Sequence, residues 1–452
     1  MRFGDGLAMR GSTRGDFLRL AAASGVFKAL LMAAPAAAVE LAPELRQPAL
    51  DTRQPDIRRR PEEARSVTPR TRARPELDPL GLRIRAFLLS ARADLRLGYN
   101  DNLFAREERT DADFVTVLAP RVELRSDWTR HALRAGANLS SGRHQDFSSE
   151  NYDDWQAFAE GRLDLGRASS VFGGTSVSSQ HEDRASPDST VGAEQSQYQV
   201  AEANLGWAHP FGRFEARLGG EWRDYQFDAV DAVGLPPGTL LGDDRNRQAV
   251  RGEGQLRYSV WPGYGVFVRG AHTAQDYDVL GPTGINRDSS GYEADLGLNL
   301  ELTDLIFGSV FVGYYRQRYE AADFEDNTGI GFGADLSWNI TPLSTLHLQG
   351  QRSVQESIDP GASGYLSTDV ALELEHELLR NLLLVASGRY TGRRYDGSER
   401  RETLWQSSFG ANYMANRRLQ LRLQLVRRQQ DGSGGGRDFT QTFVEQTVVL
   451  QY

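Results

Sequence analysis

The side chains best suited to catalysis are scattered along this sequence. Its seven histidines fall in different segments, the chain has no cysteine, and its only lysine is Lys28. One stretch combines the residue types of a serine hydrolase, namely His181, Asp183, Ser186 and Asp188. A polar loop has the same composition, and hydrolysis needs these groups in one cluster. We therefore predict that the protein is not an enzyme and has no catalytic, cofactor-binding or metal site.

Charged residues with a regular spacing are more informative. Arginines and carboxylates occupy alternate positions in several runs, which places them on one side of a strand. Mixed rings of charge inside a channel can select the solutes that pass. Arginines concentrate in the first half and several acids in the second, which predicts a field across a pore; cross-strand ion pairs that solvate the wall are an equal alternative. The candidate lumen-facing charges are Arg134, Arg162, Arg217, Arg251, Glu253, Glu293, Asp295, Glu301 and Glu373.

The same alternation indicates the elements that carry these charges. From Leu82 onward, apolar and polar residues alternate in run after run, most clearly from Tyr292 to Leu302. This period of two is typical of strands with one apolar face. An apolar outer face around a polar interior suits a closed sheet surrounded by hydrocarbon. The pattern predicts an all-β fold, a transmembrane antiparallel up-and-down β-barrel.

The connections between the runs alternate in length. Brief turns such as 209–212 and 341–344 join one set of neighbours, and long polar segments such as 228–246 join the others. Short turns at one end and longer loops at the other are expected of outer-membrane barrels. Counting the runs gives about eighteen strands, with sixteen as the alternative.

The tryptophans indicate where the membrane surfaces lie. Aromatic side chains with a polar tip favour the two membrane–water interfaces, and most tryptophans here fall near the strand ends on the apolar face. The predicted interface girdle comprises Trp128, Trp155, Trp207, Trp222, Trp338 and Trp405.

The N-terminal region differs from the rest. Residues 1–38 combine arginines, an apolar run and a small-residue site at Ala36–Ala38, which predicts a secretory signal peptide. Residues 39–79 are rich in arginine and proline and have no apolar period, which predicts a disordered periplasmic linker. A solvated tether is the simpler interpretation of this linker; docking to an anionic glycan or a partner protein is the alternative. Residues 80–452 form the predicted barrel.

The last strand ends the sequence on an aromatic residue. Val448, Leu450 and Tyr452 share one face of it, and Tyr452 is the predicted assembly signal for the outer membrane. We expect this strand, near 440–452, to pair with the first, near 85–99, because closing the cylinder removes both sheet edges.

Several stretches resemble the bacterial outer-membrane family called putative β-barrel porin 2, and the similarity covers about 79–452. They are Leu97–Phe104, Asp113–Phe114, Arg125–His131, Phe147–Tyr152, His181–Asp188 and Leu343–Leu346. Some members of that family are encoded beside exopolysaccharide genes, so the resemblance implies a role in glycan export. It implies no functional residues.

The sequence thus predicts a porin-like channel or export conduit in the bacterial outer membrane, with periplasmic termini. Its cargo is exopolysaccharide or another hydrophilic solute. A plugged structural or adhesive barrel is the alternative, and a barrel-embedded lipid or glycan hydrolase is a weaker one. Expected partners are outer-membrane lipid, lipopolysaccharide, the barrel-assembly machinery and a polysaccharide. The acidic balance of 52 basic against 61 acidic residues argues against nucleic acid.

Overall fold

The computed structural model describes most of the chain from Val67 onward. It covers residues 67–166, 168–187, 189, 194–231, 240–280, 284–302, 305–357, 359 and 362–452. The predicted signal peptide and most of the predicted linker lie outside this range.

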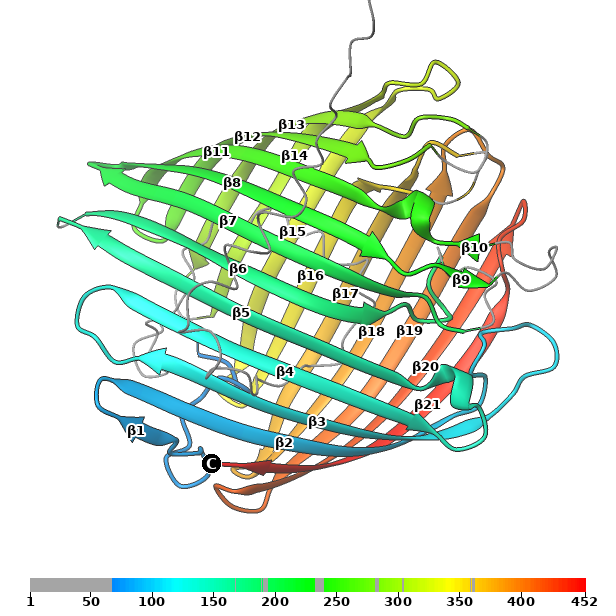
Figure 1. The fold of residues 1–452 in the computed structure, drawn as a ribbon. Coiled ribbons are helices and arrows are strands. Elements are labelled where there is room, and N and C mark those ends of the chain that lie inside the picture. Colours follow the sequence, from blue (N-terminus) through cyan, green and yellow to red (C-terminus); the bar gives the residue numbers. More distant parts are fainter. Residues whose placement is uncertain are drawn as a thin grey trace, which may run out of the picture.

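Eighteen long antiparallel strands form one closed barrel. Figure 1 shows how they follow one another around its wall. The strands are β2 (Phe87–Asn100), β3 (Asp113–Ser126), β4 (Ala132–His144), β5 (Tyr152–Leu165), β6 (Ser169–His181), β7 (Gln197–Phe211), β8 (Phe214–Phe227), β11 (Arg247–Trp261), β12 (Tyr264–Tyr277), β13 (Ser289–Leu302), β14 (Ile306–Tyr319), β15 (Asn327–Thr341), β16 (Ser344–Gln355), β17 (Tyr365–Leu379), β18 (Leu382–Tyr395), β19 (Arg401–Met414), β20 (Leu419–Ser433) and β21 (Phe439–Gln451). Each pairs with its neighbours in sequence, so the topology is up-and-down. The prediction of eighteen strands is confirmed.

The barrel closes where β21 meets β2. The seam runs from the pair Arg92–Gln451 to the pair Asn100–Phe443, and β21 lies beside β2 in Figure 1. Beyond the last strand, the Tyr452 backbone N–H donates to the Ala91 carbonyl oxygen at 2.9 Å. The predicted closure between the last and first strands is therefore confirmed; the role of Tyr452 in assembly stays a prediction.

The connections differ in length at the two ends of the barrel. At one end, termed the short-turn end, tight turns join strands such as β7 to β8 and β15 to β16. Gly212 and Gly263 in two of these turns have φ of 64° and 82°, a backbone conformation that glycine adopts without strain. The opposite, long-loop end carries two short 3-10 helices, η3 (Ser148–Glu150) and η4 (Asp243–Arg245), and a small hairpin of β9 (Val230–Asp231) and β10 (Leu240–Leu241). The predicted sorting of connections is thus observed.

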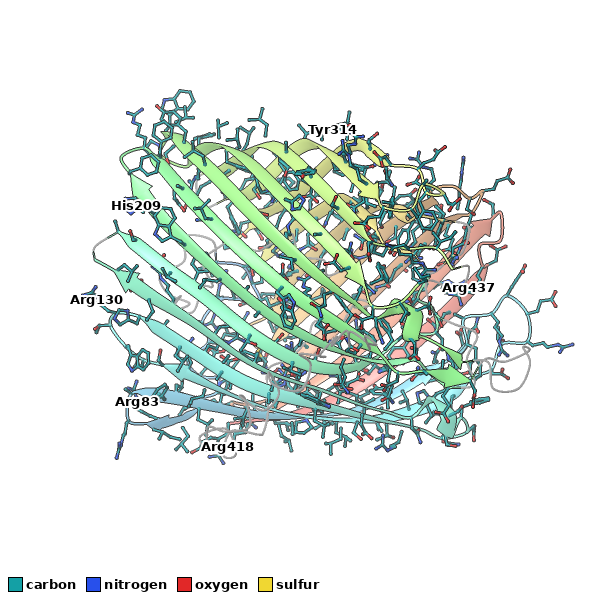
Figure 2. The ribbon with its side chains drawn as sticks, turned by 45° about the horizontal axis from the view of Figure 1, so that its top comes forward. Arg83, Arg130, His209, Tyr314, Arg418 and Arg437 are labelled. Atoms are coloured by element: carbon teal, nitrogen blue, oxygen red, sulfur yellow. The ribbon has the colours of Figure 1, made fainter. Side chains whose placement is uncertain are left out.

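Side chains alternate between the outside and the lumen as the period of two requires. Leu205 and Leu298 are 65% and 44% exposed on the outside, whereas the lumen-facing Phe172 and Phe267 are buried. Tyr314 points outward in Figure 2. In the described residues no helix has the length and apolar character to cross a membrane.

A short segment before the barrel, residues 67–79, lies against the inner wall at the short-turn end. Its Thr68, Arg70 and Thr71 line the lumen cavity, and Arg74 is only 2% exposed. The chain then forms β1 (Leu82–Ile84), which folds back onto β2. This last part of the predicted linker differs from a solvated tether because its arginines contact carboxylates of the barrel wall.

Candidate functional site: the barrel lumen

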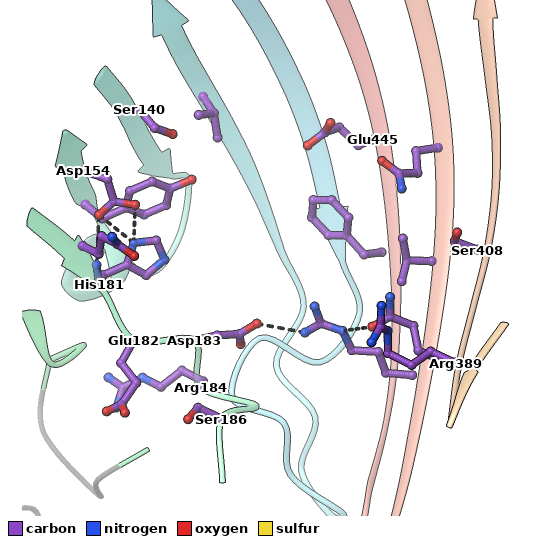
Figure 3. Close-up of a pocket in the computed structure, with 18 of the residues that line it drawn as sticks. Ser140, Asp154, His181, Glu182, Asp183, Arg184, Ser186, Arg389, Ser408 and Glu445 are labelled. Atoms are coloured by element: carbon purple, nitrogen blue, oxygen red, sulfur yellow. Dashed lines mark hydrogen bonds and ion pairs between the residues drawn. The ribbon is translucent and has the colours of Figure 1, made fainter. Parts of the chain in front are cut away.

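A cavity of about 1300 Å³ occupies the lumen between the segment 67–79 and an inward-folded loop at the long-loop end. Side chains from strands around the barrel line it, and Figure 3 shows part of this lining. The cavity is lined largely by polar and charged side chains, so it suits a hydrophilic solute.

Most lumen-facing arginines from β4 to β12 are held by carboxylates. Arg134 lies 2.9 Å from Glu123, Arg251 lies 2.8 Å from Glu293, and Arg269 lies 2.7 Å from Asp295. Further ion pairs on these strands are Arg162–Asp164, Arg217–Glu215, Arg223–Glu202, Arg251–Glu253 and Arg257–Glu215. We call this part of the lining the paired wall. Its charges neutralise one another across and along the strands.

Three arginines on the other side of the lumen have a different environment. Arg96 on β2, Arg389 on β18 and Arg422 on β20 all line the cavity, and none forms a salt bridge with a carboxylate of the described residues. We call these three the open wall. Arg422 and Arg96 flank Thr447 in one cross-strand row. Their guanidinium groups are therefore available to a solute.

The electrostatic surroundings of Arg422 reinforce this contrast. Arg92, Arg96 and Arg70 all act on Arg422 as like charges, and Asp94 is the acid that acts on it. Asp94 itself is paired with Arg92. Like charges thus dominate around Arg422, whereas the acids Asp369 and Glu373 act on Arg389.

A loop between β6 and β7 narrows the lumen at the long-loop end. Its Asp183 accepts a hydrogen bond of 2.9 Å from Arg428 on β20, six strands around the barrel, and Figure 3 shows Asp183 reaching toward those strands. Burial alone would raise the pKa of Asp183, but the Arg428 charge and the Ala185 backbone N–H hold it below its usual range. The contact between Asp183 and Arg428 is thus an ion pair that joins the loop to β20. We call this ion pair the latch.

Further ion pairs anchor this loop to its surroundings. Arg184 lies 2.7 Å from Glu150, and Glu182 lies 2.7 Å from Arg245. Arg437, labelled at the long-loop end in Figure 2, donates to the Ser186 carbonyl oxygen. The side chains of the two ion pairs are at most 10% exposed, so the loop is held at several points.

The residues of the hydrolase pattern are not assembled into one cluster. His181 Nδ1 lies 2.9 Å from an Asp154 carboxylate oxygen, and its ring stacks on Tyr152 at 3.9 Å. Asp183 instead contacts Arg428, and Ser186 is bound through its carbonyl oxygen. Asp188 lies outside the described residues. In the described residues, His181, Asp183 and Ser186 thus have separate partners.

The predicted site residues fall into three groups. Arg134, Arg162, Arg217, Arg251, Glu253, Glu293 and Asp295 belong to the paired wall. Glu373 binds Arg70 of the segment 67–79, and Glu301 stands at the short-turn end of β13. The predicted girdle residues Trp128, Trp155, Trp222, Trp338 and Trp405 are exposed on the outside, between 38% and 56%, and Trp207 stacks on His209.

The open wall was missed from the site prediction, although the pattern placed Arg96 and Arg422 on polar positions. Their lack of carboxylate partners depends on register: Arg422 is opposite Asn412 and Thr447, and Arg96 is opposite Thr447 and Val117. Three of these four pairings cross the seam or a long loop. A signal was present in the sequence, because β18 and the first ten residues of β20 contain arginines and no acid.

The closed barrel, its apolar exterior and its polar lumen define a porin-like outer-membrane barrel. The chain belongs to the family described as putative β-barrel porin 2, whose model matches residues 74–452. This confirms the resemblance noted in the sequence. A comparison with curated proteins gave no significant match.

The chain also matches solved structures at low sequence identity. OpdK from Pseudomonas aeruginosa is 13% identical, covers 80% of this chain and 99% of its own, and has a TM-score of 0.42. OccAB4 from Acinetobacter baumannii is 11% identical, with 80% and 98% covered and a TM-score of 0.44. A mutant of the ferric enterobactin receptor PfeA from Pseudomonas aeruginosa is 8% identical, with 80% of each chain covered and a TM-score of 0.43.

Proposed function

We propose that this protein is an outer-membrane channel for hydrophilic, negatively charged solutes, with acidic exopolysaccharide as one cargo class. The observation that supports the proposal is the open wall, where Arg96, Arg389 and Arg422 face the cavity without carboxylate partners in the described residues. Guanidinium groups bind carboxylates and phosphates through paired hydrogen bonds. A repeating anionic glycan could exchange one such contact for the next as it moves.

In this proposal the short-turn end and both termini face the periplasm, and the long-loop end faces outward, as in bacterial barrels of this kind. The partners are then outer-membrane lipid, lipopolysaccharide and the barrel-assembly machinery. The exposed tryptophans would lie at the two membrane surfaces.

Ion selectivity in planar bilayers tests the proposal. We expect the reversal potential in a salt gradient to indicate preference for the anion. A short uronic-acid oligomer should reduce the current at lower concentration than a neutral oligomer of equal length. A preference for cations, or equal block by both oligomers, would contradict the proposed cargo class.

A plugged barrel is the second candidate, because the segment 67–79 and the loop with Asp183 both enter the lumen. Swelling of proteoliposomes in small anionic solutes separates the two. Proteoliposomes that contain a permeable barrel swell, whereas those that contain a plugged barrel do not swell at any salt concentration.

A further inference from the structure

The segment 67–79 matches the wall behind it in charge and in spacing. Arginines stand at every second position from Arg70 to Arg74, and glutamates stand at every second position from 373 to 377 on the lumen face of β17. Side chains two residues apart point the same way along a strand, so the three glutamates form one row. The segment itself turns, because the Arg72 backbone N–H donates to the Thr68 carbonyl oxygen at 2.9 Å. Its three arginines nevertheless all reach this row.

The first contacts lie at the inner end of the segment. Arg70 Nη2 lies 2.8 Å from Glu373, and Arg70 Nε lies 2.9 Å from Glu375. The Arg70 backbone N–H also donates to Glu375 at 3.1 Å. Arg70 thus binds two successive glutamates of β17.

The next contacts lie toward the turn between β17 and β18. Arg74 Nη2 lies 2.8 Å from Glu377 and also donates to the Pro69 carbonyl oxygen at 2.6 Å, while Arg72 Nη1 lies 3.2 Å from Glu377. Arg74 is thereby held between the wall and its own segment. We call Glu373, Glu375 and Glu377 the acidic ladder.

The segment also crosses the short-turn mouth of the barrel. Asn339 donates to the Val67 carbonyl oxygen at 3.3 Å, Arg380 donates to that of Ala73 at 3.1 Å, and Arg417 donates to that of Pro75 at 2.6 Å. These partners lie at three successive short turns, β15–β16, β17–β18 and β19–β20. Because Thr68 and Arg70 line the cavity, the segment narrows the path through this mouth.

The bonds that hold the segment differ in kind from those of the wall. The barrel strands are joined by continuous backbone ladders, whereas the segment is held mainly by side chains. The Arg70 and Glu373 side chains are 43% and 32% exposed, and exposed ion pairs are weakened by salt, whereas Arg74 and Glu377 form a buried pair at 2% and 6% exposure. No backbone–backbone hydrogen bond among the described residues joins the segment to a barrel strand. The segment can therefore leave without breaking the strand ladders.

We propose that the acidic ladder is a docking surface for an arginine-rich segment, and that residues 67–79 are its occupant, a detachable plug. Release of the plug widens the short-turn mouth. The inference rests on the proposed channel function and adds control of its opening.

Charge reversal in the full mature chain tests the plug. We expect Arg70→Glu/Arg72→Glu/Arg74→Glu to raise single-channel conductance at least about twofold at low salt, where the ionic contacts are strongest. Adding Glu373→Arg/Glu375→Arg/Glu377→Arg to the same chain should return the conductance toward that of the parent. Arg83→Glu, which loses an exposed ion pair to Asp127 outside the lumen, is the matched control and should leave the conductance unchanged.

Heat-dependent gel migration verifies that each variant forms a barrel. If the charge-reversed variant does not insert into the bilayer, Arg70→Gln/Arg72→Gln/Arg74→Gln takes its place. Unchanged conductance in the released variants, or failure of the double reversal to restore it, overturns the plug. Higher conductance without anion preference would keep the plug and reject the proposed cargo class. Anion preference with no change in conductance on release of the segment would keep the proposed cargo class and reject the plug.

Discussion

Arg251 on β11 and Arg422 on β20 both face the lumen, but only Arg251 is held by carboxylates. It lies 2.8 Å from Glu293 and 3.4 Å from Glu253, whereas Arg422 bonds to Gln420 at 3.3 Å. A paired charge has already exchanged water for a protein partner, so a passing solute gains little from it. The charge of an arginine without a carboxylate partner is not neutralised by the protein, so it can attract an anionic solute. The paired wall therefore supports the barrel, and in the proposed channel the open wall is the part that would act on a solute.

The largest effect should come from breaking the paired wall. Arg251→Ala leaves the fully buried Glu253 side chain and Glu293 without this partner, and removing one member of a buried pair costs about 3 kcal/mol. We expect a clear fall in the temperature at which the barrel loses its compact gel migration. Arg389→Ala on the open wall is the control. An equal fall in both variants would remove the distinction between the walls.

Ion selectivity should change most on the open wall. Reversing a charge about 6 Å from a passing monovalent ion in water changes their interaction by about 1.4 kcal/mol, or roughly tenfold in permeability ratio before salt screening. Arg422→Glu should therefore shift the reversal potential strongly toward cations. Arg217→Glu, on the paired wall beside Glu215, is the matched reversal. A larger shift from Arg217→Glu would contradict the assignment of the open wall.

The barrel could be predicted from the sequence because each membrane-spanning strand separately needs one apolar face toward lipid and one polar face toward the lumen. Alternation shows which side of β13 faces outward, and eight short turns mark where neighbouring strands meet. Neither inference needs long-range information. The closing pairing of β21 with β2 also followed, because a closed sheet leaves no other partner for its two edges.

The charges of the lumen were harder to predict because their effect depends on partners from other strands. The hypothesis of an arginine-rich first half counted residues such as Arg134 and Arg217, but acids beside them or on the next strand neutralise both. The segment 67–79 was missed for a different reason. Its spacing of arginines matches the glutamates of β17, about 300 residues away in the chain, and local composition carries no sign of that match.

A smaller effect is expected at the latch between the two sides of the lumen. The Asp183 side chain is 34% exposed beside Arg428, and a partly exposed pair contributes about 0.5 kcal/mol, or roughly a twofold change in the released population. Asp183→Asn should therefore increase the noise of the open-channel current while leaving selectivity close to that of the parent. Asp431→Asn, at an exposed position on β20, is the control. A loss of anion preference in Asp183→Asn would show that the latch belongs to the selective site.

The pH dependence of that latch should be the weakest effect at ordinary pH. The pKa of Asp183 lies below its usual range because Arg428 and the Ala185 backbone N–H outweigh burial. A carboxylate with a lowered pKa contributes stability above the usual value of about 3.9, and this contribution is lost as the pH falls through the lowered value. Current noise in the parent should therefore stay constant from about pH 7 to pH 5 and rise only below about pH 4. Asp183→Asn, which cannot ionise there, should lack that rise. A transition near pH 6 in both proteins would assign the change to another group and remove Asp183 as the latch.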